Sequence, residues 1–367
     1  MAIDFFDSHI APAAYEEVMA CLKSGRLSEG KRVKRFEESL TDTLGFVNPV
    51  CVNSGTSALH LALVVANVGP GDEVIIPAQT FIATGLAVLM QKANVVFADC
   101  DPTTGNIDPA DVARRVTERT RAIIPVHWAG LPCDMDELNA IAAEHDLAMI
   151  EDAAHALGAT YKGKAVGSLS RMTCFSFQAI KHLTVGDGGA LCCERDAEHV
   201  RARTLRWFGI NRANSPTTEL GERDYDLTEV GYKYHMNDLA AALGIGNLTN
   251  FLDRLARRRA IAATYREALA DTPGIRLLAA PVDRESAHWL FTFRCDNRLQ
   301  LIRALKSRGV PCTVVHNRID DNTVFGGVRD DLPGQVIFDA EQLAIPVHEG
   351  LSDDDVTHII GAIQAGW

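Results

Sequence analysis

The sequence predicts an α/β fold in which helices flank a mostly parallel central sheet, with a smaller α/β domain at the C-terminal end. Three observations support this fold class. The chain has 367 residues, 47% hydrophobic and 23% charged, which is typical of a globular protein of two domains. Short apolar runs alternate with helix-length segments in the first half. A basic helical stretch near residue 250 marks a change of pattern, so we expect domains over residues 1–248 and 249–367.

Four apolar runs are the predicted strands of the first domain, and they occupy residues 74–76, 95–98, 122–126 and 148–150. Strands that alternate with helices form parallel sheets covered on both faces, so such runs need no polar side. Helices are predicted over residues 57–66 and 134–145, and from Asn237 onward to the basic stretch.

The second domain opens with the basic stretch, whose arginines are Arg254, Arg257, Arg258, Arg259 and Arg266. We expect this charge run to be the solvated face of a helix. A strand over 288–295, a helix over 299–308 and a strand over 311–315 are predicted next. Ser352 should cap the last helix, because three aspartates that suit the positive end of a helix follow it.

The composition excludes several classes of protein. Thirty-six Lys and Arg against 48 Asp and Glu give a net charge of −12, which argues against nucleic acid or an anionic membrane as the main partner. The nine cysteines include no Cys-x-x-Cys pair, which argues against a metal site and a disulfide framework. No apolar run approaches the ~20 residues that span a bilayer, and residues 1–4 do not open a signal peptide. We therefore expect a cytoplasmic protein with reduced, mostly buried thiols.

Residues 53–59, Asn-Ser-Gly-Thr-Ser-Ala-Leu, form a turn of small residues before an apolar helix. Free backbone N–H groups and the helix dipole at such a turn can hold a phosphate. The same residues would also suit an ordinary helix cap, and the segment alone leaves both interpretations open.

Asp152 follows an apolar strand, at the end where ligands bind in open α/β sheets. A buried carboxylate there needs a cationic partner, and a protonated pyridine nitrogen would serve. The alternative is that Asp152 caps the next helix.

Lys181 lies between Phe175-Ser176-Phe177 and the turn Gly186-Asp187-Gly188-Gly189. Desolvation lowers the pKa of an amine and makes it nucleophilic toward an aldehyde. The alternative is a lysine whose stem packs while its ammonium group reaches solvent, but this would leave the glycine cluster without a purpose.

Together these segments resemble the sugar aminotransferases of the DegT/DnrJ type, within the fold-type I enzymes that use pyridoxal 5′-phosphate (PLP). The resemblance covers nearly the whole chain, and its motifs lie at residues 24–27, 36–37, 53–59, 71–75, 77–84, 126–130, 151–156, 175–189, 236–244, 345–348 and 351–353. It implies a fold-type I PLP-dependent transferase with a large PLP-binding domain and a smaller C-terminal domain.

The resemblance also implies roles for residues that match the family motifs. Lys181 would form a Schiff base with PLP and shuttle a proton between the cofactor and substrate carbons. Asp152 would keep the pyridine nitrogen protonated, so that the ring acts as an electron sink. Phe81 would stack on the ring face, and His155 would lie near its phenolic oxygen.

The phosphate of PLP would be bound by Gly55, Thr56, Ser57 and Ser176. Asn237 resembles the residue that reaches the phosphate from the neighbouring subunit, which implies a homodimer with shared active sites. The alternative for Asn237 is that it caps its own helix.

The implied reaction transfers an amino group from an amino acid, with glutamate as the expected donor, to a keto sugar on a nucleoside diphosphate. Residues 181–189 look more like family members that act at the sugar C4, so we expect a 4-keto-6-deoxy sugar. His127, His182, His316 and Arg318 are candidate sugar contacts, although His127 could instead cap a turn. Loops around 207–232 and 312–332 would select the nucleotide and the sugar.

Other functions remain open on the sequence. Relatives of this family aminate inositol ketones or 3-keto sugars, and others catalyse dehydration with histidine in place of the Schiff-base lysine. The presence of Lys181 disfavours dehydration. A PLP-binding regulatory protein without turnover is the alternative from a different class.

Overall fold

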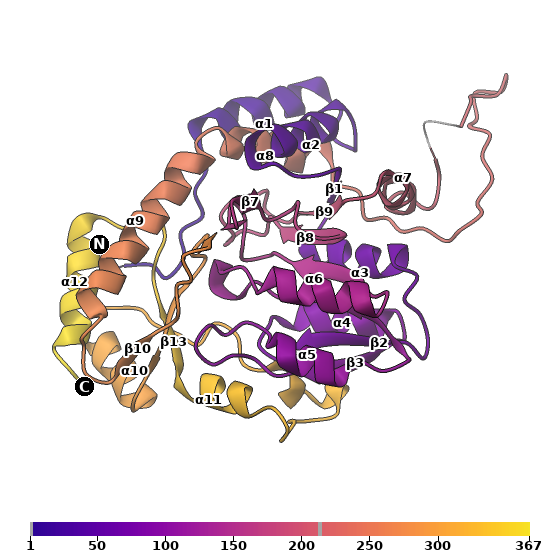
Figure 1. Ribbon diagram of the computed structural model, residues 1–367. Helices are drawn as coiled ribbons and strands as arrows, with labels where there is room; N and C mark the ends of the chain where they lie inside the picture. Colours follow the sequence, from indigo (N-terminus) through magenta and orange to yellow (C-terminus); the bar gives the residue numbers. More distant parts are fainter. Residues whose placement is uncertain (1–2, 212–214) are drawn as a thin grey trace.

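The structure is a computed structural model that describes residues 3–211 and 215–367 (Figure 1). Residues 1–2 and 212–214 lie outside this description. The second of these segments belongs to the loop around 207–232 that we expect to select the nucleotide and the sugar.

A seven-stranded sheet forms the centre of the larger part of the molecule, in the order β1-β9-β8-β5-β4-β2-β3. Its strands are β1 (Pro49–Val52), β2 (Glu73–Pro77), β3 (Asn94–Ala98), β4 (Thr120–Ile123), β5 (Ala148–Asp152), β8 (Met172–Ser176) and β9 (Gly189–Cys193). Pairing is parallel from β3 through β2, β4 and β5 to β8, whereas β9 is antiparallel to both β8 and β1. The mostly parallel sheet expected from the sequence is confirmed, and each predicted run lies in or overlaps one of its strands.

Helices cover both faces of this sheet (Figure 1). The helices of the larger part are α1 (Pro12–Ser24), α2 (Lys31–Leu44), α3 (Gly55–Val65), α4 (Ile82–Met90), α5 (Pro109–Arg115), α6 (Met135–Glu144), α7 (Asp196–Leu205) and α8 (Asp238–Leu248). In β2, Val74 and Ile76 pack in the apolar cluster that α3, α4 and α7 share, and Ile75 packs with α5 and α6. Alternate residues of one strand therefore serve opposite faces, which explains its continuous apolar run.

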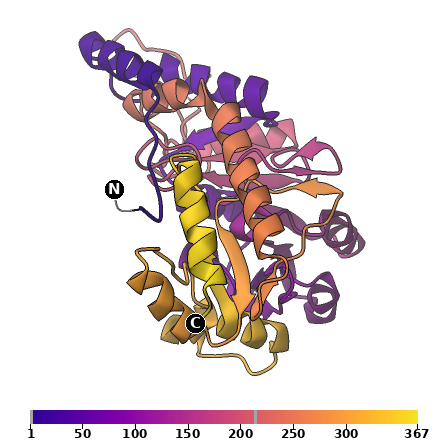
Figure 2. The same cartoon turned by 90° about the vertical axis from the view of Figure 1, so that its left-hand side faces the viewer.

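The smaller part is built on a three-stranded antiparallel sheet, β10 (Ile275–Leu277), β12 (Phe291–Cys295) and β13 (Gln342–Ile345). Its helices are α9 (Phe251–Leu269), α10 (Arg298–Ser307), α11 (Pro333–Glu341) and α12 (Asp353–Gln364). Figure 2 shows α12 beside α9, and both contribute to one apolar cluster with β12 and β13. Ser352 caps α12 in a capping box with Asp355, as predicted.

Three predicted elements differ from the structure. The helix expected from Asn237 onward is two helices, α8 and α9, with a break at Thr249 and Asn250. The strand expected over 288–295 begins only at Phe291, because His288 has a φ of 48° and is not extended. The strand expected over 311–315 is absent from the structure, which has only a bridge between Thr313 and Ala344.

The two parts of the chain are closely joined. A small sheet pairs β11 (Arg284–Glu285) from the second part with β6 (Thr160–Tyr161), which also pairs with β7 (Lys164–Ala165). The short helices Ile319–Asp321 and Thr323–Phe325 place Ile319 and Phe325 in the apolar core above the large sheet. A division at residues 248 and 249 remains our proposal, and it would separate segments that share part of a core.

The expectation of a solvated basic face is wrong for two of its arginines. Arg254 and Arg258 are only 9% and 3% exposed. Their Nε atoms donate to the two carboxylate oxygens of Glu349, at 2.7 Å and 2.6 Å. The carboxylate lies more than 90 residues further along the chain, so the local charge pattern could not indicate the pairing.

All nine cysteines are buried and none is in a disulfide, which confirms the expected state of the thiols. Across residues 3–211 and 215–367, no helix combines the length and the apolar character needed to cross a bilayer.

Candidate active site

A cavity of about 290 Å³ lies at the end of the central sheet where the parallel strands finish. The start of α3, the end of β5 and the loop that carries Lys181 form most of its wall, and Trp289 and His316 from the second part of the chain complete it. This is the edge of an open α/β sheet where ligands bind.

The start of α3 forms one end of the cavity. Ser54 caps the helix by accepting a hydrogen bond from the Ser57 backbone at 3.0 Å, and Gly55 and Thr56 line the cavity. A Cβ on Gly55 would lie 2.9 Å from the Cβ of Ser176, so only glycine allows the helix start to approach this residue. Ser57 does not line the cavity, and its hydroxyl donates to Asn53 Oδ1 at 2.7 Å. The segment is therefore both a helix cap and a cavity wall.

Asp152 lies buried at the floor of the cavity. Its Oδ2 accepts a hydrogen bond from Thr84 Oγ1 at 2.7 Å, and its Oδ1 accepts one from the Ala154 backbone at 3.1 Å. Burial raises the pKa of this carboxyl, while the two hydrogen bonds and the nearby Lys181 oppose the rise. Residues 153–158 form turns rather than a helix, so Asp152 does not cap one.

Lys181 faces the same cavity from the loop between β8 and β9. The surrounding protein lowers the pKa of its amine to about 7, an effect that Asp152 opposes. Its Nζ lies 3.6 Å from the ring centroid of Trp289. A substantial fraction of the amine is therefore unprotonated near neutral pH, as nucleophilic attack requires.

Three distant segments hold the backbone of the Lys181 loop. Ser8 Oγ donates to the carbonyl of Ala179 at 2.8 Å, and Trp289 Nε1 donates to that of Ile180 at 3.0 Å. Arg254 Nη2 donates to the carbonyl of His182, the residue after the lysine. The position of Lys181 thus depends on residues far from it in sequence.

An aromatic wall faces Lys181. The rings of His155 and Trp289 stack with centroids 3.8 Å apart, and the ring of His316 lies 5.6 Å from His155 and 5.2 Å from Phe81. Burial lowers the pKa of His155 well below its usual range and that of His316 to about 4, and Lys181 adds to both shifts. Both imidazoles are therefore neutral at pH 7. Phe81 lies at the rim, 52% exposed.

Sequence reasoning missed Trp289 and the residues that hold His316. The carbonyl of His316 accepts hydrogen bonds from Gln79 Nε2 at 3.1 Å and from Gln342 Nε2 at 3.2 Å. Gln335 in turn donates to Gln79 at 2.9 Å, and all three glutamines are buried. The available signal was weak, namely a tryptophan at the edge of a predicted strand and glutamines on separate elements.

Three expected sugar contacts do not line the cavity. His127 is fully buried, and its Nε2 lies 2.7 Å from Glu151 Oε2. Its Nδ1 accepts a hydrogen bond from the backbone N–H of Cys133 at 3.1 Å. His182 is buried against the carbonyl of Ala287 at 2.8 Å, and Arg318 pairs with Asp320 at 2.6 Å. Each of these side chains is engaged by neighbours within the fold.

Asn237 is exposed at the start of α8 and does not line this cavity. Its Oδ1 accepts a hydrogen bond from the Ala240 backbone at 2.8 Å, so Asn237 does cap its own helix.

Comparison with known proteins agrees with this geometry. The model of the DegT/DnrJ/EryC1/StrS aminotransferase family matches residues 9–364. GDP-perosamine synthase of Caulobacter vibrioides is 35% identical over 356 residues, which cover 95% of this chain and 93% of that protein. The sugar aminotransferase CalS13 from Micromonospora echinospora is similar over 100% of both chains, with a TM-score of 0.94 and 34% identity. The sugar aminotransferase Spr1654 from Streptococcus pneumoniae, in its pyridoxamine 5′-phosphate (PMP) form, is similar over 100% of this chain and 97% of that chain, with a TM-score of 0.91 and 30% identity.

Proposed function

The chain belongs to the DegT/DnrJ/EryC1/StrS aminotransferase family and is a PLP-dependent sugar aminotransferase. We propose that it transfers an amino group from L-glutamate to a 4-keto-6-deoxy sugar on a nucleoside diphosphate. The observation that carries the proposal is one cavity that contains both Lys181, with a pKa of about 7, and the buried carboxylate of Asp152. The relative named GDP-perosamine synthase supports a nucleotide-linked substrate.

The cavity fits PLP on three observations. The start of α3 presents backbone N–H groups to the cavity, and Gly55 lets this helix start come close to Ser176, so that the N–H groups and the Ser176 hydroxyl can reach the same phosphate. The buried carboxylate of Asp152 is poised for a cation, which a protonated ring nitrogen supplies. The neutral fraction of the Lys181 amine suits an aldehyde.

The residues of the chain divide the work of the reaction. When bound, PLP supplies an electron sink for the bonding electrons of the substrate carbon. Lys181 Nζ would accept the proton from that carbon and return it to the cofactor carbon, and Asp152 would hold the positive charge on the ring nitrogen. The neutral rings of His155 and Trp289 would exclude water from the face they cover.

We also propose a homodimer in which Asn237 completes the partner's phosphate site. Asn237 is exposed, and its cap uses only the side-chain oxygen, which leaves the amide NH₂ available to donate across an interface.

The test is to incubate PLP-loaded enzyme with glutamate and GDP-, UDP- and dTDP-linked 4-keto-6-deoxy sugars, and to detect the aminated product by mass spectrometry. Matched 3-keto sugars and an inositol ketone serve as competing substrates, and Lys181→Ala is the inactive control. We expect amination of a 4-keto sugar. Preference for a 3-keto sugar or an inositol ketone would overturn the substrate, and failure of glutamate to convert the cofactor to its amine form would overturn the donor.

A further inference from the structure

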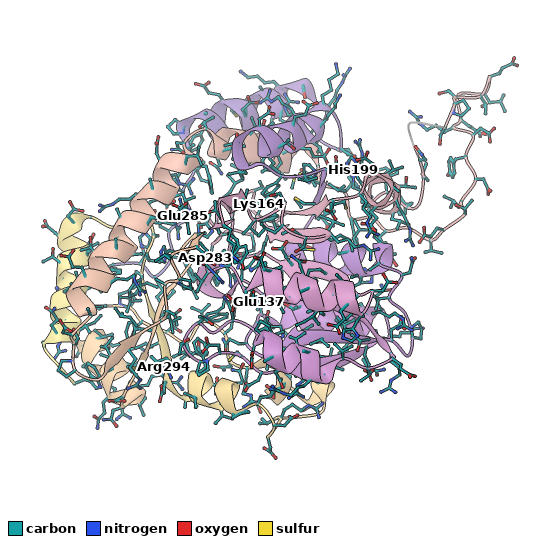
Figure 3. All side chains as sticks on the ribbon, in the orientation of Figure 1. Glu137, Lys164, His199, Asp283, Glu285 and Arg294 are labelled. Carbon is teal, nitrogen blue, oxygen red and sulfur yellow. The ribbon has the colours of Figure 1, made fainter. Side chains whose placement is uncertain are left out.

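A second cavity, of about 220 Å³, lies behind the wall that carries Trp289. Trp128, Ala129, His288 and Leu290 line it from the side of the active site, and α9 and the segment 278–286 line it from the other side. Figure 3 labels Glu285, which lies on that segment and contributes to the lining. Nothing in the proposed reaction uses this cavity.

Three arginines line this second cavity, and two of them have carboxylate partners. Arg259 Nη1 lies 3.2 Å from Glu285, and Arg284 pairs with Asp283 and Asp134, each at 2.8 Å. These two arginines and three carboxylates account for one another within the protein.

Arg266 is different, because in the described part of the chain it has no carboxylate partner. Its one hydrogen bond runs from Nη1 to the carbonyl of Leu278 at 2.9 Å, although the side chain is half-buried. Burial lowers the pKa of its guanidinium with no opposing charge. Partial removal of a cation from water without a counterion costs free energy, and an anion in the adjacent cavity would offset that cost.

Two further groups suit an anion there. The hydroxyl of Thr292, a cavity-lining residue that is 7% exposed, has no hydrogen-bond partner among the described residues. His288, which also lines the cavity, lies close enough to Arg259 and Arg266 for both cations to add to the effect of burial, which lowers the pKa of this imidazole to about 4. The rest of the lining is mainly apolar, with Trp128, Leu278 and Phe291 among its members.

We propose that this cavity binds a small organic anion, whose carboxylate or phosphate group pairs with Arg266 and whose apolar body packs against Trp128 and Leu278. The planar guanidinium can donate two parallel hydrogen bonds to either kind of anionic group. The ligand would contact the segment 288–290, and therefore the backbone next to Trp289 of the active site. This site is separate from the aminotransferase cavity and does not depend on the identity of the sugar.

The experiment titrates PLP-loaded enzyme with phenyl phosphate, benzoate and the neutral benzyl alcohol by isothermal titration calorimetry, and follows tryptophan fluorescence in parallel. We expect phenyl phosphate or benzoate to bind, and benzyl alcohol to bind at least about tenfold more weakly. The two anions distinguish a phosphate ligand from a carboxylate ligand.

Variants then locate the binding. Arg266→Gln removes the unpaired cation, and Ala280→Trp fills the mouth of the cavity from an exposed position without changing any charge. Arg303→Gln, an exposed arginine on α10, is the matched control. We expect both cavity variants to weaken anion binding at least about tenfold, and the control to leave it unchanged. Equal binding of the neutral ligand, no binding by either anion, or binding that persists in Ala280→Trp would overturn the proposal, even if Arg266→Gln fails to fold.

Discussion

Replacing Glu349 with glutamine removes the carboxylate that neutralises two buried arginines. Arg254 and Arg258 each donate to it, and Arg254 also donates to the carbonyl of His182, next to Lys181. Loss of the carboxylate would leave both guanidinium groups buried without a counterion, and we expect lower stability and a looser Lys181 loop.

The magnitude follows from the pKa of Glu349. Burial alone would raise it, but Arg258 and Arg254 lower it from 4.5 to about 2. Because the folded-state pKa lies below the unfolded value, the carboxylate stabilises the fold above pH 4.5, and this stabilisation is lost as the pH falls toward 2. The shift corresponds to about 3 kcal/mol at pH 7, and less than half of it remains at pH 3.

Urea denaturation of the cofactor-free protein, followed by circular dichroism at one protein concentration, measures this effect. We expect Glu349→Gln to lower the free energy of unfolding by about 3 kcal/mol at pH 7 and by less than half as much at pH 3. The control is Glu341→Gln, which removes a more exposed partner of Arg276 and Arg294 and should cost less than about 1 kcal/mol. A loss for Glu349→Gln that is no larger than the control, or that is equal at both pH values, would refute the reasoning.

Three further predictions concern the active site. Asp152→Asn should retain PLP but slow both half-reactions by about a hundredfold, because an amide cannot hold the ring nitrogen charged; near-normal single-turnover rates would contradict this role. Trp289→Phe keeps a ring beside Lys181 but removes the hydrogen-bond donor to the Ile180 carbonyl. We therefore expect kcat to fall by up to about tenfold with the cofactor still bound, and an unchanged kcat would exclude the positioning role of Trp289. Mixed dimers of Lys181→Ala and Asn237→Ala chains should be more active than either variant alone, because one of their two sites carries neither defect. If Asn237→Ala alone is impaired and verified heterodimers show no recovery, the shared site is excluded.

The sequence was most informative where chemistry and local structure coincide. The turn at residues 53–59 was open to a second interpretation as a helix cap, whereas the glycine cluster after Lys181 had no purpose outside a ligand site, and both lie at the cavity in the structure. Asp152 was predictable because it ends an apolar strand at the edge where ligands bind.

Contacts between distant segments could not be predicted from local patterns. Trp289 and His316 reach the cavity only because the second part of the chain folds back onto the first. His127 has the residue type of a sugar contact, yet Glu151 and the Cys133 backbone bind both its ring nitrogens. The arginines of α9 have the pattern of a solvated face, and only the fold brings Glu349 to two of them.

Borohydride reduction of the PLP-loaded enzyme, followed by peptide mapping, tests most directly the claim that Lys181 holds the cofactor. Reduction converts the link between PLP and its lysine into a stable secondary amine, so the modified peptide identifies the residue. We predict a pyridoxyl group on Lys181 alone, and none on Lys181→Ala protein whose circular dichroism shows that it is folded. A pyridoxyl group on any other lysine of the wild-type chain would contradict the claim.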